Sequence, residues 1–219
     1  MHFFLLLLLF IINSSFISPF LSSTDEWQLK KQESGISVYT RTAENSSFKE
    51  LKSQVQIKTS LSSIIALLND WDSYPQWVYK CGKSNTIKKI NETELIHYQT
   101  LIAPWPVDDR DFVVNVKLSQ DAKTKTVYQK AVCIPDYIPK VDGHVRITEF
   151  KALWTITPLK NGMVNVEYQL LVDPGGNIPA WLVNLAVVDG PFETTFHLKE
   201  WVMKAKYQNA KFSYIKELE

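Results

Sequence analysis

The side chains best suited to chemistry lie in the decapeptide APWPVDDRDF, residues 103–112, where three carboxylates surround one arginine. Asp108, Asp109 and Asp111 offer the hard oxygen ligands that Ca²⁺ prefers. Arg110 stands between them and would repel a cation, and the ligand spacing of known calcium loops is missing. We therefore predict no metal site here. The segment is expected to form a turn with local ion pairs where a strand begins.

Other reactive side chains are scattered along the chain. No H-x-x-x-H or C-x-x-C pair, glycine-rich phosphate loop or G-x-S-x-G motif is present, so the sequence predicts no metal, no cofactor and no catalytic residue. Asp72 and His97 are suited to acid–base chemistry, but nothing in the sequence places them together. Cys81 and Cys133 either pair or stay as free thiols, and the apolar sequence AVCIP around Cys133 favours a buried free thiol.

The overall composition is that of one globular domain. The chain has 219 residues, of which 45% are hydrophobic and 21% charged, and its net charge is +1. This composition suits a single α+β domain. A nucleic-acid partner is not expected, because the basic excess that binds polyanions is absent.

The first 23 residues form a leader of a different class. FFLLLLLFII, residues 3–12, is an uninterrupted apolar run, and no charged side chain precedes Asp25. The run is shorter than a membrane span and suits the core of a signal peptide. Residues 1–23 are therefore predicted to be a signal peptide or a retained N-terminal membrane anchor. The protein would accordingly be exported to a periplasmic or extracellular space, or anchored to a membrane.

Most of the remaining chain alternates between apolar and polar residues with period two, the pattern of half-buried strands. One segment within residues 60–78 instead has the spacing of a helix, in which Ser62 or Ser63 is the cap and Ile64, Ile65, Leu67 and Leu68 are the apolar residues. The alternation changes phase within HVRITEFKALWTI, residues 144–156, which predicts a β-bulge and a strongly curved sheet.

Residues 178–209 have a helical pattern over their whole length, interrupted at Gly190-Pro191. One side of this helix carries an apolar or small stripe, formed by Val183, Val187, Gly190, Thr194, Leu198 and Trp201. The concave face of a curved sheet is the surface that can bury such a helix. The stripe by itself is also what a solid core requires.

Five segments, in their order and spacing, resemble the START family, the steroidogenic acute regulatory protein-related lipid transfer domains, over residues 25–210. They are GISVYTR, FKE, PWPVDDRDFVV, DGHVRITEFKALWTI and DPGGNIPAWLVN…PFETTFHL. The resemblance implies the α+β helix-grip fold, a curved antiparallel β-sheet wrapped around a long C-terminal α-helix with an internal hydrophobic cavity. Residues 211–219 would be a C-terminal tail.

The resemblance also implies which residues meet the ligand. The helix should contribute one wall of the cavity, with His97 and Gln99 as polar contacts and Trp154 beside them. The expected ligand-binding residues are Val183, Val187, Gly190, Pro191, Thr194, Leu198, His97, Gln99 and Trp154. An acidic and basic pair found in some sterol-binding members falls on His97 and Val116 here, so that pair is not retained.

Two further expectations concern the mouth of the cavity and the headgroup of a lipid ligand. Residues 134–143 match the family's loop at the cavity mouth, with Ile138 at its tip, although an ordinary connection explains such a loop equally well. The expected gate residues are Pro135, Tyr137, Ile138 and Pro139. A choline headgroup would need an aromatic cage. The aromatic residues available for one are Trp105, Trp154, Tyr168 and Trp181.

The implied function is that a monomer binds a hydrophobic or amphipathic lipid-like molecule, carries or senses it, and makes transient contact with a membrane. A helix-grip enzyme of the cyclase or hydrolase type, acting in the same cavity, is the alternative, and it requires titratable groups that converge there. A third hypothesis is an interaction module whose interior is filled. That hypothesis requires a cavity smaller than ~300 Å³.

Overall fold

A computed structural model describes residues 26–43, 46–176, 178, 183 and 187–218. The leader and Trp181 lie outside these residues, so the predictions made for them concern a part of the chain that is not described. In chain order the elements are β1 (Gln28–Glu33), β2 (Ile36–Thr42), β3 (Lys49–Lys58), α1 (Leu61–Leu68), η1 (Trp71–Ser73), α2 (Tyr74–Trp77), β4 (Cys81–Lys89), β5 (Glu94–Leu101), β6 (Asp109–Gln120), β7 (Val127–Cys133), β8 (His144–Arg146), β9 (Glu149–Pro158), η2 (Lys160–Gly162), β10 (Met163–Asp173), α4 (Asp189–Trp201) and α5 (Ala205–Gln208).

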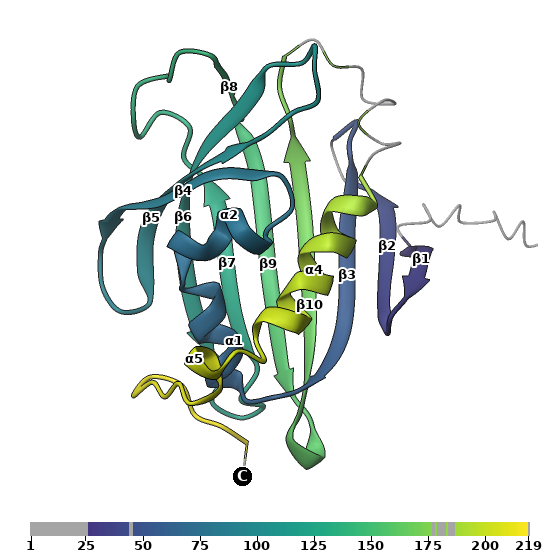
Figure 1. Ribbon diagram of the computed structural model, residues 1–219, viewed down its shortest axis with the longest axis vertical. Coiled ribbons are helices and arrows are strands. Elements are labelled where there is room, and N and C mark those ends of the chain that lie inside the picture. The colour runs from purple at the N-terminus through teal and green to yellow at the C-terminus, as the bar shows by residue number, and fades with distance from the viewer. Residues whose placement is uncertain (1–25, 44–45, 177, 179–182, 184–186, 219) are drawn as a thin grey trace, which may run out of the picture.

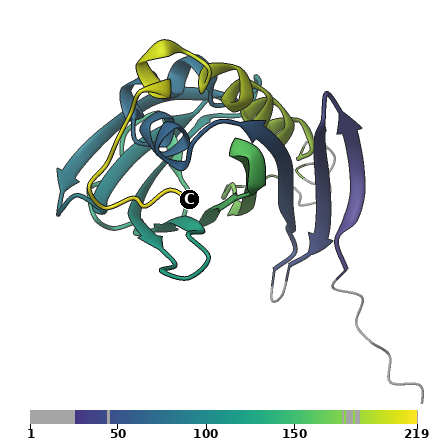
Figure 2. The same ribbon diagram turned by 90° about the horizontal axis from the view of Figure 1, so that it is seen from below.

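A single curved sheet is the framework of the molecule. Its strands follow the order β1-β2-β3-β10-β9-β7-β6-β5-β4 and are antiparallel, and β8 pairs with β6 in parallel. Helix α4 runs obliquely across the concave face, and α1 and α5 lie near one end of it (Figure 1). Seen from below, the sheet bends around the helices (Figure 2). The α+β helix-grip architecture expected from the sequence is confirmed.

The alternation of residues along each strand decides what the concave face contains. On β3, Leu51, Val55 and Ile57 are buried, while the lysines and glutamines between them are more exposed. Val55 lies opposite Val166 of β10, so the apolar faces of neighbouring strands are in register. The period-two pattern in the sequence therefore produces one continuous apolar surface for the helices to cover.

The bulge expected within residues 144–156 was wrong. The chain there forms two strands with different partners: β8 pairs with β6, whereas β9 pairs with β7 and β10. Between them Ile147 is completely buried and its N–H donates to the carbonyl of Asp111 at 2.9 Å. The change of phase therefore marks the passage from one pairing to another, which a single-strand pattern cannot distinguish from a bulge.

Helix α1 begins two or three residues earlier than expected. Its cap is Ser60, whose hydroxyl accepts from the N–H of Ser63 at 3.0 Å; Ser62 and Ser63 lie inside the first turn. The carboxylate of Glu217 accepts from the N–H groups of Leu61 and Ser62, both at 2.9 Å. A negative charge at a helix N-terminus is favourable. The C-terminal tail is thus attached to the domain by its own side chains.

The C-terminal helix is shorter in the described residues than its sequence pattern indicated. Helix α4 ends at Trp201, and Lys204 is extended (φ −64°, ψ 140°) before the short α5 begins. This break redirects the chain so that the hydroxyl of Tyr207 reaches Asp70 at 2.7 Å. Tertiary contacts with the segment after α1 therefore override the helical periodicity.

Candidate ligand-binding cavity

A cavity of about 570 Å³ lies between the concave face of the sheet and the N-terminal half of α4. Its walls come from alternate residues of the central strands, because every second side chain points to the concave side. Strand residues in the wall include His97, Gln99 and Leu101 of β5, Phe112, Val114 and Val116 of β6, Gln129 and Ala131 of β7, Ala152 and Trp154 of β9, and Tyr168 and Leu170 of β10.

Eight of the nine residues expected to meet a ligand line this cavity. They are Val183, Val187, Gly190, Pro191, Thr194, His97, Gln99 and Trp154. Val116, which occupies the second position of the sterol-type pair, lines it as well. The helical stripe and the polar residues of β5 are separated by more than 80 positions in the sequence, yet they line the same cavity.

Leu198 is the exception, because it does not line the cavity. It lies on the stripe but is completely buried in the main hydrophobic core, and it does not belong to the cavity wall. The stripe leaves the cavity between Thr194 and Leu198, because α4 crosses the sheet obliquely and its C-terminal end reaches the core near α1 (Figure 1). A periodic stripe shows which side of a helix is buried, but not where along it a void ends.

The small residues of α4 bring a neighbouring segment close to the cavity. A Cβ placed on Gly190 would lie 3.4 Å from the ring of Tyr79, and the N–H of Tyr79 donates to the hydroxyl of Thr194 at 3.2 Å. Helix α4 is fixed on its other side by Ser53 and Thr195, whose hydroxyls are 2.5 Å apart. These contacts fix the helix between β3 and the segment that leads from α2 into β4.

The four aromatic residues named for a choline cage do not all meet in the described part of the chain. Trp154 and Tyr168 both line the cavity, but they stack on each other with ring centroids 4.1 Å apart and an interplanar angle of 14°. Each ring thus covers one face of the other. Trp105 lies elsewhere, with 93% of its surface exposed.

His97 is the most deeply buried polar residue of the wall, at 1% exposure. Its ring packs against Trp71, with centroids 4.4 Å apart, and lies 6.1 Å from the ring of Tyr74. Its Nε2 is 3.1 Å from the hydroxyl of Ser84, whereas its Nδ1 has no hydrogen-bond partner among the described residues. Burial lowers the pKa of His97 to about 3, so the imidazole is neutral at physiological pH.

Arg110 is the other notable polar group of the wall. It is 3% exposed, and its guanidinium donates to the carbonyls of Asp108, Pro174 and Gly175. Burial lowers its pKa, and the nearby Asp108 and Asp109 oppose that effect. Arg110 therefore joins the start of β6 to the turn after β10, and it contributes a positive charge to a wall that includes no Asp or Glu among the described residues.

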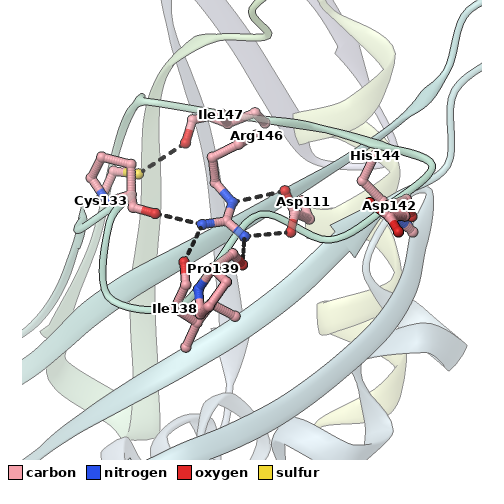
Figure 3. Close-up of polar contacts among 9 residues, drawn as sticks. Asp111, Cys133, Ile138, Pro139, Asp142, His144, Arg146 and Ile147 are labelled. Carbon is pink, nitrogen blue, oxygen red and sulfur yellow. Dashed lines mark hydrogen bonds and ion pairs between the residues drawn. The ribbon is translucent and has the colours of Figure 1, made fainter.

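The acidic cluster that dominates the sequence is a structural corner. Asp111 is completely buried and accepts two hydrogen bonds of 2.8 Å from Nε and Nη2 of Arg146, whose side chain is 3% exposed. Arg146 also donates to the carbonyls of Pro135 (2.5 Å), Ile138 (3.1 Å) and Pro139 (3.1 Å). Figure 3 shows the guanidinium at the centre of these contacts. The hydrogen bonds that Arg146 donates to Asp111 raise the pKa of Arg146.

The same contacts change the interpretation of the loop 134–143, which was expected to gate the cavity. Pro135, Tyr137, Ile138 and Pro139 are not part of the cavity wall. Ile138, expected at an exposed tip, is half-buried against the cluster of Ile96, Tyr98 and Val113 on the other face of β5 and β6. The loop is held there because Arg146 binds three of its carbonyls. Of the four expected gate residues, Tyr137, at 44% exposure, and Pro139 are exposed.

The rim of the cavity is formed instead by the segment that opens the decapeptide. Ile102, Ala103, Pro104 and Val107 line the cavity, and Trp105 protrudes between them. Ile102 is itself 46% exposed. The N–H of Ala103 donates to Asp109 at 2.9 Å, which attaches this rim to the start of β6.

The remaining expectations about reactive groups concern the cysteines and metals. Cys81 and Cys133 are both free, and the thiol of Cys133 contacts the carbonyl of Ile147 at 3.3 Å. Burial raises the pKa of Cys81 to about 12. Within the described ranges no three His, Cys, Asp or Glu side chains gather as metal ligands, and no helix there is both long and apolar enough to cross a membrane.

Sequence reasoning missed three aromatic residues of the wall and one residue that supports the wall from behind. Trp71, Tyr74 and Trp77 enclose the cavity from η1 and α2, and the density of aromatic residues in WDSYPQW was a signal for them. Ser84 was also missed, and no local signal could have found it, because it reaches His97 only through the pairing of β4 with β5.

Comparison with known proteins gives consistent matches over most of the chain. The model of the START domain family matches residues 12–210. An uncharacterized protein of Pseudomonas aeruginosa is 32% identical over 170 residues, which cover 78% of this chain and 83% of the relative. Phosphatidylcholine transfer protein of Rattus norvegicus is 24% identical over 183 residues, covering 78% of this chain and 81% of that protein.

Solved structures agree with these matches. The STAR-related lipid transfer protein of Xanthomonas axonopodis has a TM-score of 0.76 and 34% identity, covering 81% of this chain and 99% of that one. Human StAR-related lipid transfer protein 5 has a TM-score of 0.71 at 17% identity, covering 83% and 88%; at that identity the likeness concerns the fold alone.

Proposed function

The chain belongs to the START domain family, and from that premise we propose that it binds one lipid-like molecule in the cavity and carries it through water. The observation that carries the proposal is the cavity of about 570 Å³ between the sheet and α4. This volume lies within the range of small-molecule sites and above the ~300 Å³ that an interaction module with a filled interior would leave. The names of the relatives, lipid transfer proteins, support the same ligand class.

The chemistry of the wall supports an apolar ligand body. Most lining side chains are aliphatic or aromatic, and burying an alkyl chain against them gains about 25 cal/mol for each Å² removed from water. The charged groups among the described lining residues are Lys80 and Arg110, with no carboxylate opposite them. This lack of an acidic partner favours a carrier over the enzyme alternative, which needs a general acid and base positioned together.

Contact with a membrane is part of the proposal, because a carrier must exchange its ligand with lipid. The rim at residues 102–107 supports this step, since Trp105 is 93% exposed next to the half-exposed Ile102. Tryptophan favours the boundary between water and hydrocarbon, where its ring is buried and its N–H stays hydrated. The contact surface we propose is therefore the 102–107 rim rather than the 134–143 loop.

Export remains part of the proposal and rests on the leader alone. A monomeric carrier released from the leader would work in a periplasmic or extracellular space, and one that keeps it would work at the membrane surface. N-terminal sequencing of the protein isolated from its source distinguishes the two, since a cleaved leader would leave a new terminus near residue 24.

The proposal is tested by filling the cavity. Ala131→Trp on β7 places a large ring in the wall, while Lys130→Trp puts the same ring on the exposed, opposite face of that strand. Uptake of a pyrene-labelled fatty alcohol, followed by energy transfer from the tryptophans, should fall at least tenfold in the first variant and stay unchanged in the second. Circular dichroism checks that both variants fold.

Two outcomes would overturn the proposed function. Equal uptake by the Ala131→Trp variant and the wild type would mean that the ligand binds outside the cavity. If instead the gently extracted native protein carried no lipid by mass spectrometry and bound none of a panel of labelled lipids, the protein would not be a lipid carrier.

A further inference from the structure

The buried imidazole of His97 is the part of the cavity wall that the packing of the protein leaves incomplete. Buried polar atoms in folded proteins almost always have a hydrogen-bond partner, and each exception calls for an explanation. Among the described residues, the buried side-chain atoms without a partner are the Nδ1 of His97 and the Oδ1 of Asn85, and of these two residues only His97 lines the cavity. His97 is therefore the place to look for a group supplied by the ligand.

The hydrogen bonds of Ser84 determine which ring nitrogen of His97 carries the proton. The hydroxyl of Ser84 donates its single proton to the carbonyl of Trp71 at 2.6 Å. The same oxygen lies 3.1 Å from Nε2 of His97, so it can only accept there, and Nε2 must be the N–H. In a neutral imidazole the other nitrogen then has a lone pair and no proton. Nδ1 is consequently an acceptor that can be satisfied only by a donor.

The surroundings keep His97 in this state. Trp71 packs against its ring, Tyr74 lies beside it, and the hydroxyl of Tyr74 is occupied by the carbonyl of Leu68 at 2.7 Å. No carboxylate lines the cavity among the described residues, so nothing there favours a second proton on the imidazole. The low pKa that burial gives His97 agrees with this geometry.

We propose that Nδ1 of His97 accepts a hydrogen bond from a hydroxyl or N–H group of the ligand, and that Ser84 and Trp71 hold the imidazole in the accepting tautomer. This inference rests on the proposed function and names the ligand class: an apolar molecule with an uncharged hydrogen-bond donor, such as a long-chain alcohol or a lipid with a free hydroxyl or amide. A quaternary ammonium headgroup has no N–H and leaves Nδ1 unpaired.

The test uses two probes that differ only in the donor. A pyrene-labelled decanol and the corresponding pyrene-labelled alkyl fluoride have nearly the same size, but fluorine cannot donate a hydrogen bond. The full chain should bind the alcohol about tenfold more tightly than the fluoride, the difference expected for one buried hydrogen bond. His97→Phe keeps an aromatic ring in the wall and should bind both probes equally. Ile96→Val, on the opposite face of β5, should keep the preference.

A second measurement does not depend on a substituted protein. Nitrogen chemical shifts of the His97 ring in the wild type should report a protonated Nε2 and a bare Nδ1, and addition of the decanol probe should move the Nδ1 resonance more than that of Nε2. In Ser84→Ala the tautomer is no longer fixed, so the preference for the alcohol should fall even though the ring remains.

Each outcome has one meaning. If the wild type binds alcohol and fluoride equally, or if Nδ1 carries the proton, the inference about His97 is overturned while the carrier function stands. If neither probe enters the wild-type cavity, the proposed function itself fails. If His97→Phe preferred the alcohol over the fluoride as strongly as the wild type does, the hydroxyl of the alcohol would donate to another residue of the wall, and the inference about His97 would be wrong.

Discussion

Two buried polar sites lie on the neighbouring strands β5 and β6, and they differ in how completely the protein satisfies them. At the corner, Arg146 uses its five N–H donors on five oxygens: two of Asp111 and three carbonyls of the 134–143 loop. In the cavity wall, His97 has a partner for one ring nitrogen and none for the other. A polar site completed by the protein supports structure, and one left open inside a cavity is available to a ligand.

The difference reverses the impression given by the sequence. The charged decapeptide looks like a reactive centre, yet its buried carboxylate is fully occupied in fixing β6, β8 and the loop (Figure 3). The single histidine of β5 lies in the uncharged stretch LIHYQTL, residues 95–101, yet it carries the unpaired nitrogen. Charge density is thus a weaker indicator of a binding site than an unfilled hydrogen-bonding position.

The largest expected effect on stability comes from removing the guanidinium of Arg146 at the corner. Arg146→Met leaves the buried carboxylate of Asp111 without its partner and releases three loop carbonyls, so the free energy of unfolding should fall by about 3–5 kcal/mol. Urea denaturation followed by tryptophan fluorescence measures the loss. Lys117→Met, which removes the exposed pair with Glu94 (3.1 Å), is the matched control and should shift the midpoint little. Equal shifts in the two variants would contradict the comparison.

The pH dependence of the free energy of unfolding tests whether His97 is buried as a neutral base. Folded His97 has a pKa of about 3, below the ordinary 6.5, so between these values the unfolded chain binds the extra proton. Stability contributed by the neutral imidazole is present above pH 6.5 and is lost as the pH falls toward 3. At pH 5 the loss is about 2 kcal/mol.

The measurement is the difference between the wild type and His97→Phe in urea denaturation at several pH values. Taking the difference removes groups that titrate in both proteins. If the two stability curves ran parallel from pH 7 to pH 4, His97 would not be a buried neutral base, and the contrast with the corner would disappear.

The smallest effect on stability is expected six residues before Asp111. Trp105 is 93% exposed, so Trp105→Ser should change the free energy of unfolding by no more than about 0.5 kcal/mol. Transfer of the pyrene-labelled alcohol between phosphatidylcholine vesicles should nevertheless slow several-fold, while equilibrium uptake by the protein stays the same. An unchanged transfer rate would remove this rim from the proposed membrane contact.

Much of the cavity wall was accessible from local patterns. Helical spacing placed Gly190 and Thr194 on one face of α4, whereas His97 and Gln99 were named from the resemblance to the START family. Leu198 was wrongly included because periodicity records the direction of a side chain and not its depth along the helix. The gate residues were wrong in position, because the loop that holds them is fixed by Arg146.

The sequence by itself determined the family, the helix-grip architecture and the faces of the elements, since these depend on motifs and on periods of two and 3.6 residues that each segment carries alone. The tertiary structure decided which buried polar groups have a hydrogen-bond partner for every donor and acceptor. Asp111 meets Arg146 across 35 positions, and His97 meets Ser84 across 13, through strand pairings that no local pattern encodes. A hydrogen bond needs both partners in place, so only the folded chain shows which one is missing.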